Sequence, residues 1–242
     1  MTLAAHDATL SGRLAGVSAA LEAGQLTAIC GPNGAGKSSL LAALAGLLPL
    51  DAGRVTLGNA PLDSFAARKR AQAIGYLPQD GEVAWDIAVR SLVALGRLPH
   101  GDRGEEEVAS ALAALDLGAL AGRPVSTLSG GERSRALLAR VLAGQPQWIL
   151  ADEPLAALDL AHQQRLLREF RAQADAGAGV VMVVHDLALA ANHADSVLVL
   201  DEGQVVESGL PKDALSSAVL REIWKVEAQW VGPQGARALQ IG

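Results

Sequence analysis

A glycine-rich loop close to the start of the chain has the residue types and spacing of a phosphate-binding loop, G-x-x-x-x-G-K-S. Glycines let such a backbone curl tightly and aim its N–H groups at phosphate oxygens. A lysine at this spacing reaches the outer phosphates, and the serine hydroxyl binds Mg²⁺. The residues are Gly31, Pro32, Asn33, Gly34, Ala35, Gly36, Lys37 and Ser38, with Ser39 next in the chain.

A loop of this kind requires a strand before it and a helix after it, and the sequence predicts both. Residues 26–30 form a short apolar run suited to a buried parallel strand, and residues 39–45 favour a buried helix that ends at Gly46. An ordinary glycine-rich turn is the alternative, but such a turn needs neither flanking element. We therefore expect residues 31–39 to bind nucleotide phosphates, at the N-terminal end of that helix.

Polar residues suited to nucleotide chemistry follow three further apolar runs. They are Gln79 after residues 74–77, Asp152 and Glu153 after residues 148–151, and His185 after residues 180–184. Ligands of open parallel sheets bind beyond the carboxyl ends of the strands. If these strands pair, the polar residues and the loop face one site.

Each of these polar residues has a role in the reaction that this site would carry out. Asp152 is suited to holding Mg²⁺ directly or through water, and Glu153 to polarising a water that attacks the γ-phosphate. His185 is expected to contact the γ-phosphate, and Gln79 to bind Mg²⁺ or the attacking water. Any one of them alone would be an ordinary surface residue.

A second motif, Leu128-Ser129-Gly130-Gly131-Glu132, stands before a helix predicted to run through Ala143. Ser129 and Glu132 fit a helix-capping box, which is the simpler interpretation. Two glycines in a first turn cost about 1 kcal/mol each against alanine, so we expect a close approach to another anion. This motif lies in a helical block and need not face its own chain's phosphate loop.

Composition limits the class of protein. The chain has 242 residues, of which 50% are hydrophobic, enough for one large α/β domain or two small ones. Its net charge of −6 argues against a nucleic-acid-binding surface. The lone cysteine, Cys30, excludes an internal disulfide and is expected to pack inertly in its strand. No apolar run is long enough to span a membrane and no signal peptide is evident, so we expect a cytoplasmic protein whose membrane role comes through a partner.

Strand and helix patterns divide the chain into an α/β part and a helical block. Short strands are predicted before residue 30, and helix periodicity dominates residues 80–145, with amphipathic runs at 86–95 and 105–115. The α/β pattern returns at residue 146. A hairpin is expected at 197–206, then a helix at 212–225 and one final strand.

Together these motifs resemble the ATP-binding cassette (ABC) ATPases over nearly the whole chain. Residues 31–38 look like Walker A, Gln79 like the Q-loop, Leu128–Glu132 like the signature, 148–153 like Walker B, Leu158-Asp159 like the D-loop and His185 like the switch histidine. The resemblance implies an α/β P-loop NTPase core with a mostly parallel sheet, an N-terminal antiparallel β region and a helical subdomain at about 80–145, in a single domain 1–242.

The same resemblance implies an ATPase that uses ATP and Mg²⁺ and works as a head-to-tail homodimer. Each ATP would lie between one chain's Walker A and the other chain's signature. Ser129, Gly130, Gly131 and Glu132, together with Asp159, would then complete the partner's nucleotide site.

A narrower resemblance, carried by Leu95-Gly96-Arg97-Leu98-Pro99-His100 and by residues 158–163, is to importer ATPases for iron–siderophore complexes, haem and vitamin B12. It implies two membrane permease subunits, a solute-binding protein outside the membrane, and a peripheral position on the cytoplasmic face of the inner membrane. Residues 80–97, with Trp85, would face the permease. Packing of Trp85 inside the helical block is the alternative.

Several positions depart from the family pattern. The family usually stacks adenine on an aromatic residue near the N-terminus, but residues 3–14 contain no Phe, Tyr or Trp, and only His6 could substitute. Ser39, Ser134 and Leu155 replace residues that are common in the family. None of these changes removes a reacting group, so we expect an active enzyme.

Two other classes of protein agree less well with these motifs. A cassette ATPase acting on nucleic acid would show a coiled-coil insertion, tandem cassettes or a basic surface, and none is present. A small-molecule kinase would leave the motif at 128–132 unexplained.

Overall fold

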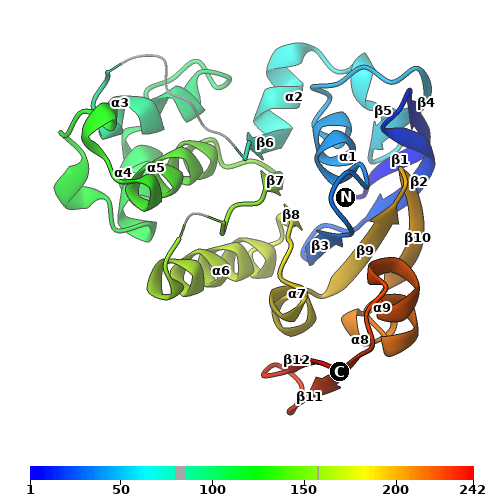
Figure 1. Ribbon diagram of the computed structural model, residues 1–242. Coiled ribbons are helices and arrows are strands. Elements are labelled where there is room, and N and C mark those ends of the chain that lie inside the picture. Colours follow the sequence, from blue (N-terminus) through cyan, green and yellow to red (C-terminus); the bar gives the residue numbers. More distant parts are fainter. Residues whose placement is uncertain (80–85, 157) are drawn as a thin grey trace.

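A six-stranded sheet forms the centre of the computed structural model, which describes residues 1–79, 86–156 and 158–242 (Figure 1). The strand order is β10-β9-β3-β8-β7-β6, and every pair is parallel except the β9–β10 hairpin. The strands are β3 (Leu26–Cys30), β6 (Ile74–Leu77), β7 (Trp148–Asp152), β8 (Gly179–Val183), β9 (Ser196–Asp201) and β10 (Gln204–Gly209). Strands β3, β7 and β8 are buried along their whole length, which explains their uninterrupted apolar sequence.

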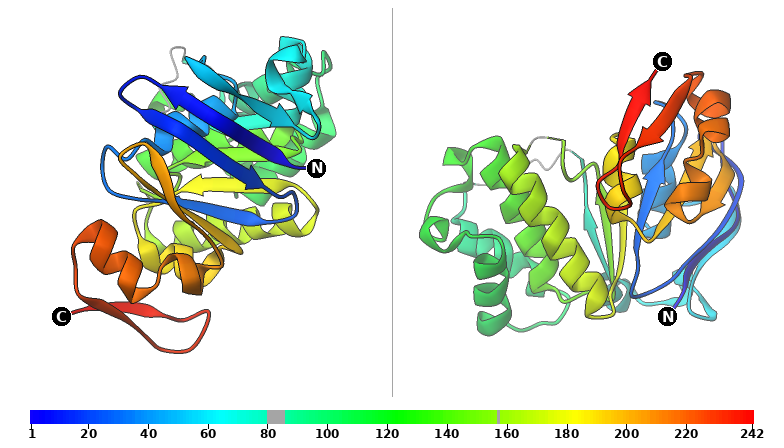
Figure 2. Two further views of the ribbon diagram at one scale, coloured as in Figure 1. Left: turned by 90° about the vertical axis from the view of Figure 1, so that its right-hand side faces the viewer. Right: turned by 90° about the horizontal axis from the view of Figure 1, so that it is seen from below.

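A second, antiparallel sheet covers one face of the first (Figure 2). Its order is β2-β1-β4-β5, from β1 (Leu3–Leu10), β2 (Leu14–Leu21), β4 (Ala52–Leu57) and β5 (Ala60–Pro61). Helix α1 (Lys37–Leu44) shares one apolar core with both sheets. The expected α/β class, with a mostly parallel sheet and an antiparallel N-terminal region, is confirmed.

Helices gather on the other side of the parallel sheet (Figure 1). They are α3 (Val89–Ala94), α4 (Glu105–Ala114), α5 (Gly130–Ala143), α6 (Leu160–Asp175) and α7 (Leu187–His193). The remaining helical elements of the chain are η1 (Leu62–Ser64), α2 (Ala67–Ala73), η2 (Leu95–Arg97), η3 (Gly118–Leu120), η4 (Val125–Thr127), α8 (Pro211–Ala214) and α9 (Ser217–Trp224). Helices α3, α4 and α5 pack on one another and carry the motif that begins at Leu128.

Two predicted helices differ from the structure. The run predicted at 86–95 becomes helical only at Val89, because Ile87 O accepts the N–H of Val125 and Ala88 bridges to Pro124. The helix predicted at 212–225 is two helices, since the chain breaks at Leu215 and Ser216 caps α9.

The C-terminal end holds a hairpin of β11 (Ala228–Val231) and β12 (Ala238–Ile241) where one strand was expected. Trp85 lies outside the described residues. No helix in the described part of the chain has both the length and the apolarity to cross a membrane. Cys30 is fully buried, and burial raises the pKa of its thiol to about 12, so it packs as an inert apolar residue, as expected.

Candidate active site

The phosphate-binding loop wraps the carboxyl end of β3 and leads directly into α1. Its backbone is left-handed at Gly34 and Gly36. A Cβ built on Gly36 would lie 2.4 Å from Arg13 O, so no larger residue fits there. The loop therefore depends on its glycines for both its conformation and its packing.

The Lys37 side chain turns back into this loop. Its Nζ donates hydrogen bonds of 2.8 Å to Gly31 O and to Pro32 O, and burial lowers the pKa of its amino group, an effect that Glu153 opposes. Lys37 is thus a buried cation whose acceptors are backbone carbonyls of the loop itself. An anion in the loop would give this cation a stronger acceptor.

Ser38 and Asp152 place a hydroxyl and a carboxylate side by side next to Lys37. Ser38 Oγ donates to Asp152 Oδ1 over 3.0 Å. Asp152 is 4% exposed, and burial raises the pKa of its carboxyl, whereas the Ser38 hydrogen bond lowers it. Oxygen ligands of this kind suit Mg²⁺, so this pair fits the ion that the sequence implies.

Glu153, Gln79 and His185 meet at the ends of three adjacent strands. Gln79 Nε2 donates to Glu153 Oε2 over 2.9 Å, and His185 Nε2 lies 2.6 Å from Glu153 Oε1. Strands β6, β7 and β8 are neighbours in parallel, which brings residues from three distant parts of the sequence together. Figure 1 shows these strand ends on the edge of the sheet that also carries the start of α1.

The motif at Ser129 forms the predicted capping box. The helix start at Ser129, Gly130 and Gly131, called the tip below, has open space beside Gly130. Ser129 N donates to Glu132 Oε2 over 2.8 Å, and Glu132 N donates to Ser129 Oγ over 3.3 Å. A Cβ built on Gly130 would meet nothing within 4 Å. Among the described residues, no hydrogen bond joins this tip to the phosphate-binding loop of the same chain.

Asp159 lies apart from the cluster around Glu153. It caps α6 by accepting the backbone N–H of His162 over 3.0 Å, and its carboxylate lies 2.8 Å from His162 Nδ1. These contacts hold the pKa of Asp159 below its ordinary value, with the backbone bond as the larger cause. The side chain is exposed, as a role toward another chain would require.

Arg133, in the first turns of α5, is a neighbour of the site that sequence reasoning missed. It lines a small hollow of about 90 Å³ together with Gln79, Asp152 and Glu153. Its Nε is buried and has no hydrogen-bond partner in the described part of the chain. The only signal available in the sequence was its place one helical turn beyond Ser129.

His6 and Arg13 have defined surroundings in the N-terminal region. His6 Nε2 lies 2.9 Å from Thr56 Oγ1, so its ring is tied to the neighbouring strand β4. The backbone of Arg13, in the β1–β2 turn, is what borders the phosphate-binding loop, because Arg13 O lies against Gly36 and Gly203.

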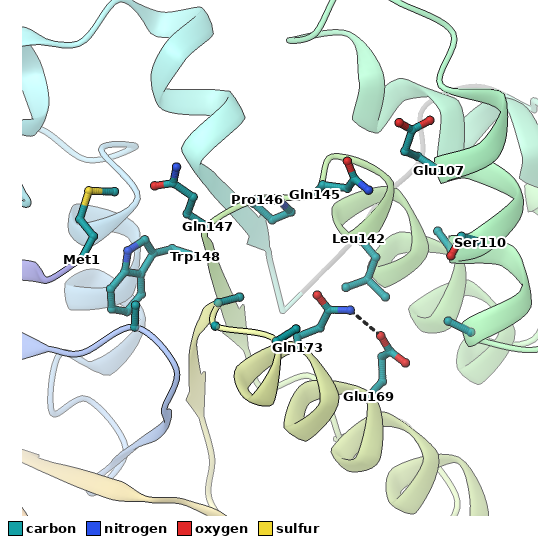
Figure 3. A pocket seen from close by; sticks show the side chains of 16 residues that line it. Met1, Glu107, Ser110, Leu142, Gln145, Pro146, Gln147, Trp148, Glu169 and Gln173 are labelled. Carbon is teal, nitrogen blue, oxygen red and sulfur yellow. Dashed lines mark hydrogen bonds between the residues drawn. The ribbon is translucent and has the colours of Figure 1, made fainter.

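A hollow of about 630 Å³ lies at the opposite edge of the sheet and contains none of the predicted site residues (Figure 3). It opens at the start of β7 beside Trp148 and extends to α4 and α6. Its polar lining includes Glu169, which accepts a 2.8 Å hydrogen bond from Gln173 Nε2. Cavity size therefore does not mark the site, whereas convergence of reactive groups does.

Comparison with known proteins agrees with this geometry. The family described as "ABC transporter" matches residues 14–156. The hemin import ATP-binding protein HmuV of Streptomyces coelicolor is 45% identical over 222 residues, which cover 89% of this chain and 79% of that protein.

Two solved structures share the fold. One is cbiO1 from Clostridium perfringens, part of the ABC transporter complex cbiONQ, with a TM-score of 0.77, 27% identity and coverage of 91% of this chain and 92% of that one. The other is a bacterial Atm1-family ABC exporter with ATP bound, with a TM-score of 0.82, 28% identity and coverage of 93% of this chain and 41% of that one.

Proposed function

Because this chain belongs to the ABC transporter family and is an ATPase of that family, we propose that it drives import of hemin or a related iron chelate. The observation that carries the ATPase is the convergence of Gln79, Glu153 and His185 beside Ser38 and Asp152. The cargo rests on the hemin importer relatives. The fold itself fits either direction of transport, since an exporter shares it.

The nucleotide's phosphates would bind in the loop of residues 31–39. The first N–H groups of a helix such as α1 have no partners within the helix and attract anions, and Lys37 would exchange its carbonyl acceptors for phosphate oxygens. Ser38 and Asp152, with Gln79, would hold Mg²⁺. When bound, this ion supplies charge neutralisation to the phosphates.

Glu153 acts as the general base toward the attacking water. Its carboxylate receives hydrogen-bonding groups on both oxygens, from Gln79 and from His185, so its orientation is fixed before any substrate arrives. Gln79 also orients that water, and His185 contacts the γ-phosphate. A rearrangement of these two contacts frees the carboxylate for the water.

Two copies of the chain form the complete site. The tip made of Ser129, Gly130 and Gly131 is exposed at its first two residues and has open space above Gly130, as an approach to a partner's nucleotide requires. Glu132 holds that tip through the capping box. Asp159 supplies a further contact across the dimer.

The assembly includes two membrane permease subunits and a solute-binding protein outside the membrane. The chain is peripheral, on the cytoplasmic face of the inner membrane, and binds no nucleic acid, in keeping with its net charge of −6. Residues 1–242 act as one ATPase domain, with the helical subdomain at about 80–145 inserted in it.

Substitution of Glu153 tests both parts of this proposal. In the purified chain, Glu153→Gln should lower ATP hydrolysis about 100-fold or more while ATP binding is retained, because a positioned base contributes about 10²–10⁴-fold. In the source organism, deletion of this chain should abolish growth on hemin as the only iron source. The parent chain should restore growth and Glu153→Gln should not.

Lys69→Ala is the control, since Lys69 is exposed on α2 and outside the site. It should restore growth fully. Hydrolysis at the parental rate by Glu153→Gln would contradict the assignment of the base. Unimpaired growth of the deletion strain on hemin, with loss of growth on a ferric siderophore or of cobalamin uptake, would contradict the proposed cargo.

A further inference from the structure

Residues 95–102, which include the segment Leu95–His100, contact both the core and the C-terminal end of helix α5, which also packs directly on β6 through Val141 and Gly75. Helix α2 immediately precedes β6, the strand that ends at Gln79, so it belongs to the nucleotide-binding core. Helix α5 starts at the exposed tip of Ser129. Residues 95–102 contact both helices, and the proposed function assigns no task to them.

On the α5 side, this segment binds the last turn of the helix. Arg97 Nη1 donates to Ala143 O over 3.2 Å, and His100 Nε2 lies 2.9 Å from Gly144 O. The final carbonyls of a helix have no partner within it and attract cations, so both contacts stabilise this end. A Cβ built on Gly96 would lie 2.0 Å from Arg140 O, which shows that the two backbones touch.

Arg97 is held in place on its other side. It is 4% exposed, and it forms a two-bond ion pair with Asp102 at 2.9 Å and 2.7 Å. The Asp102 hydrogen bond raises the pKa of Arg97. A bidentate pair of this kind fixes the guanidinium in direction as well as in position.

On the core side, two side chains of α2 donate hydrogen bonds to backbone carbonyls of the same segment. Arg68 Nε donates to Pro99 O and Arg68 Nη2 to His100 O, each over 2.5 Å, and Gln72 Nε2 donates to Pro99 O over 2.8 Å. Residues 95–102 are therefore bonded to α2 and α5 at once. These hydrogen bonds link α2 to α5 in addition to the covalent chain that follows β6.

We propose that Arg68, Gln72, Arg97 and His100 are positioning residues that set the direction of α5 from the core and so place the Ser129 tip. Helix α5 has 14 residues, a length of about 21 Å at about 1.5 Å per residue. A tilt of about 5° at its held end moves the tip by about 2 Å. A misplacement of a reacting group by about 1 Å can lower the rate about 100-fold. The contacts at the C-terminal end of α5 therefore affect ATP hydrolysis at the Ser129 tip. This inference rests on the proposed function of the tip.

Removal of the hydrogen bonds from Arg68 and Gln72 tests the proposal in two measurements. Spin labels at Asn59→Cys in the core and Ser126→Cys beside the tip report the distance between them, and the buried Cys30 stays unlabelled. In the double variant Arg68→Ala/Gln72→Ala, the distance distribution should broaden and kcat for ATP should fall about fivefold or more. ATP affinity of the single chain should stay within about twofold, because the phosphate-binding loop is unchanged.

Two further variants separate positioning from loss of charge or of bulk. Lys69→Ala removes a cation from the same helix and should leave both measurements at parental values. His100→Gln keeps an N–H donor for Gly144 O and should preserve the narrow distribution, whereas His100→Ala should broaden it.

A parental distance distribution in Arg68→Ala/Gln72→Ala would overturn the proposal, and so would a broadened distribution with parental kcat. Failure of the proposed function of the tip looks different, because Ser129→Arg would then retain parental ATP hydrolysis. In that case the distances alone decide whether α2 holds α5, and a parental distribution again overturns it.

Discussion

Glu153 has a strained backbone and defined side-chain contacts, as a residue that takes part in a reaction often does. Its φ is 48°, in the left-handed region that non-glycine residues seldom enter, and such a conformation costs about 1 kcal/mol or more. The bend follows Asp152 directly, so two successive carboxylates face different partners. Asp152 bonds with Ser38, and Glu153 meets Gln79 and His185. Strain at this position is in keeping with a functional site.

The Arg97–Asp102 pair gives a prediction at the same scale. Arg97 holds the pKa of the Asp102 carboxyl below its ordinary value of 3.8, chiefly by hydrogen bonding. A lowered folded pKa means that the native state favours the ionised form, so this stability is present above the ordinary pKa and is lost as pH falls through the folded one. Asp102→Asn should therefore lower the urea midpoint at neutral pH.

The difference between Asp102→Asn and the parent should shrink as pH falls below about 4, because the parent's carboxyl then protonates too. Urea unfolding between about pH 2 and pH 7 measures it. Asp63→Asn, at an exposed acidic residue whose carboxylate has no hydrogen-bond or ion-pair partner among the described residues, is the control and should follow the parent at every pH. A difference that stays constant across this range would contradict the assignment.

At the scale of elements, α5 combines a good cap with poor helix formers. Ser129 and Glu132 satisfy each other's backbone N–H groups at its start, whereas Gly130 and Gly131 weaken the first turn. The cap alone would explain a stable helix start, but it does not explain the glycines. Open space above Gly130 fits a surface that another molecule approaches closely.

Gly130→Ala separates stability from function in this helix. Since the added methyl meets nothing within 4 Å, the isolated chain should gain up to about 1 kcal/mol in free energy of unfolding. ATP hydrolysis should fall, because the methyl would stand between the tip and the partner's nucleotide. Gly118→Ala, which also meets nothing within 4 Å, is the matched control and should keep parental hydrolysis. Parental hydrolysis in Gly130→Ala would argue against the tip's role.

Elements with strong local signals were predictable from the sequence, and those set by distant pairing were not. Strands β3, β7 and β8 are apolar throughout because both faces are buried, and their ends located Asp152 and His185. The late start of α3 depends on a bond between Ile87 and Val125, far apart in sequence. The buried Arg97 pair was likewise missed, because Arg97 is an ordinary surface residue type.

At the scale of the whole molecule, the proposed site consists of two parts that lie on different groups of elements. The loop, Asp152, Glu153 and His185 lie together on one edge of the parallel sheet, whereas the Ser129 tip belongs to the helical group and bonds to none of them in the described chain. Strand order made the first part predictable, because parallel strands share a carboxyl edge. The second part depends on another copy of the chain, which no pattern within one sequence can position.

Complementation between two inactive variants tests this account most directly. Lys37→Ala disables the loop, and Ser129→Arg disables the tip. In a mixed dimer, one site carries both defects and the other carries neither, because its loop and its tip come from different chains. The control mixes the parent with the double variant Lys37→Ala/Ser129→Arg, in which no mixed dimer contains an intact site.

We predict that equal amounts of Lys37→Ala and Ser129→Arg, each inactive alone, regain about one quarter of parental ATP hydrolysis, since half of the dimers are mixed and each holds one intact site of two. In the control, activity should come only from parent–parent dimers. A mixture that stays as inactive as its two components would contradict a site shared between two chains.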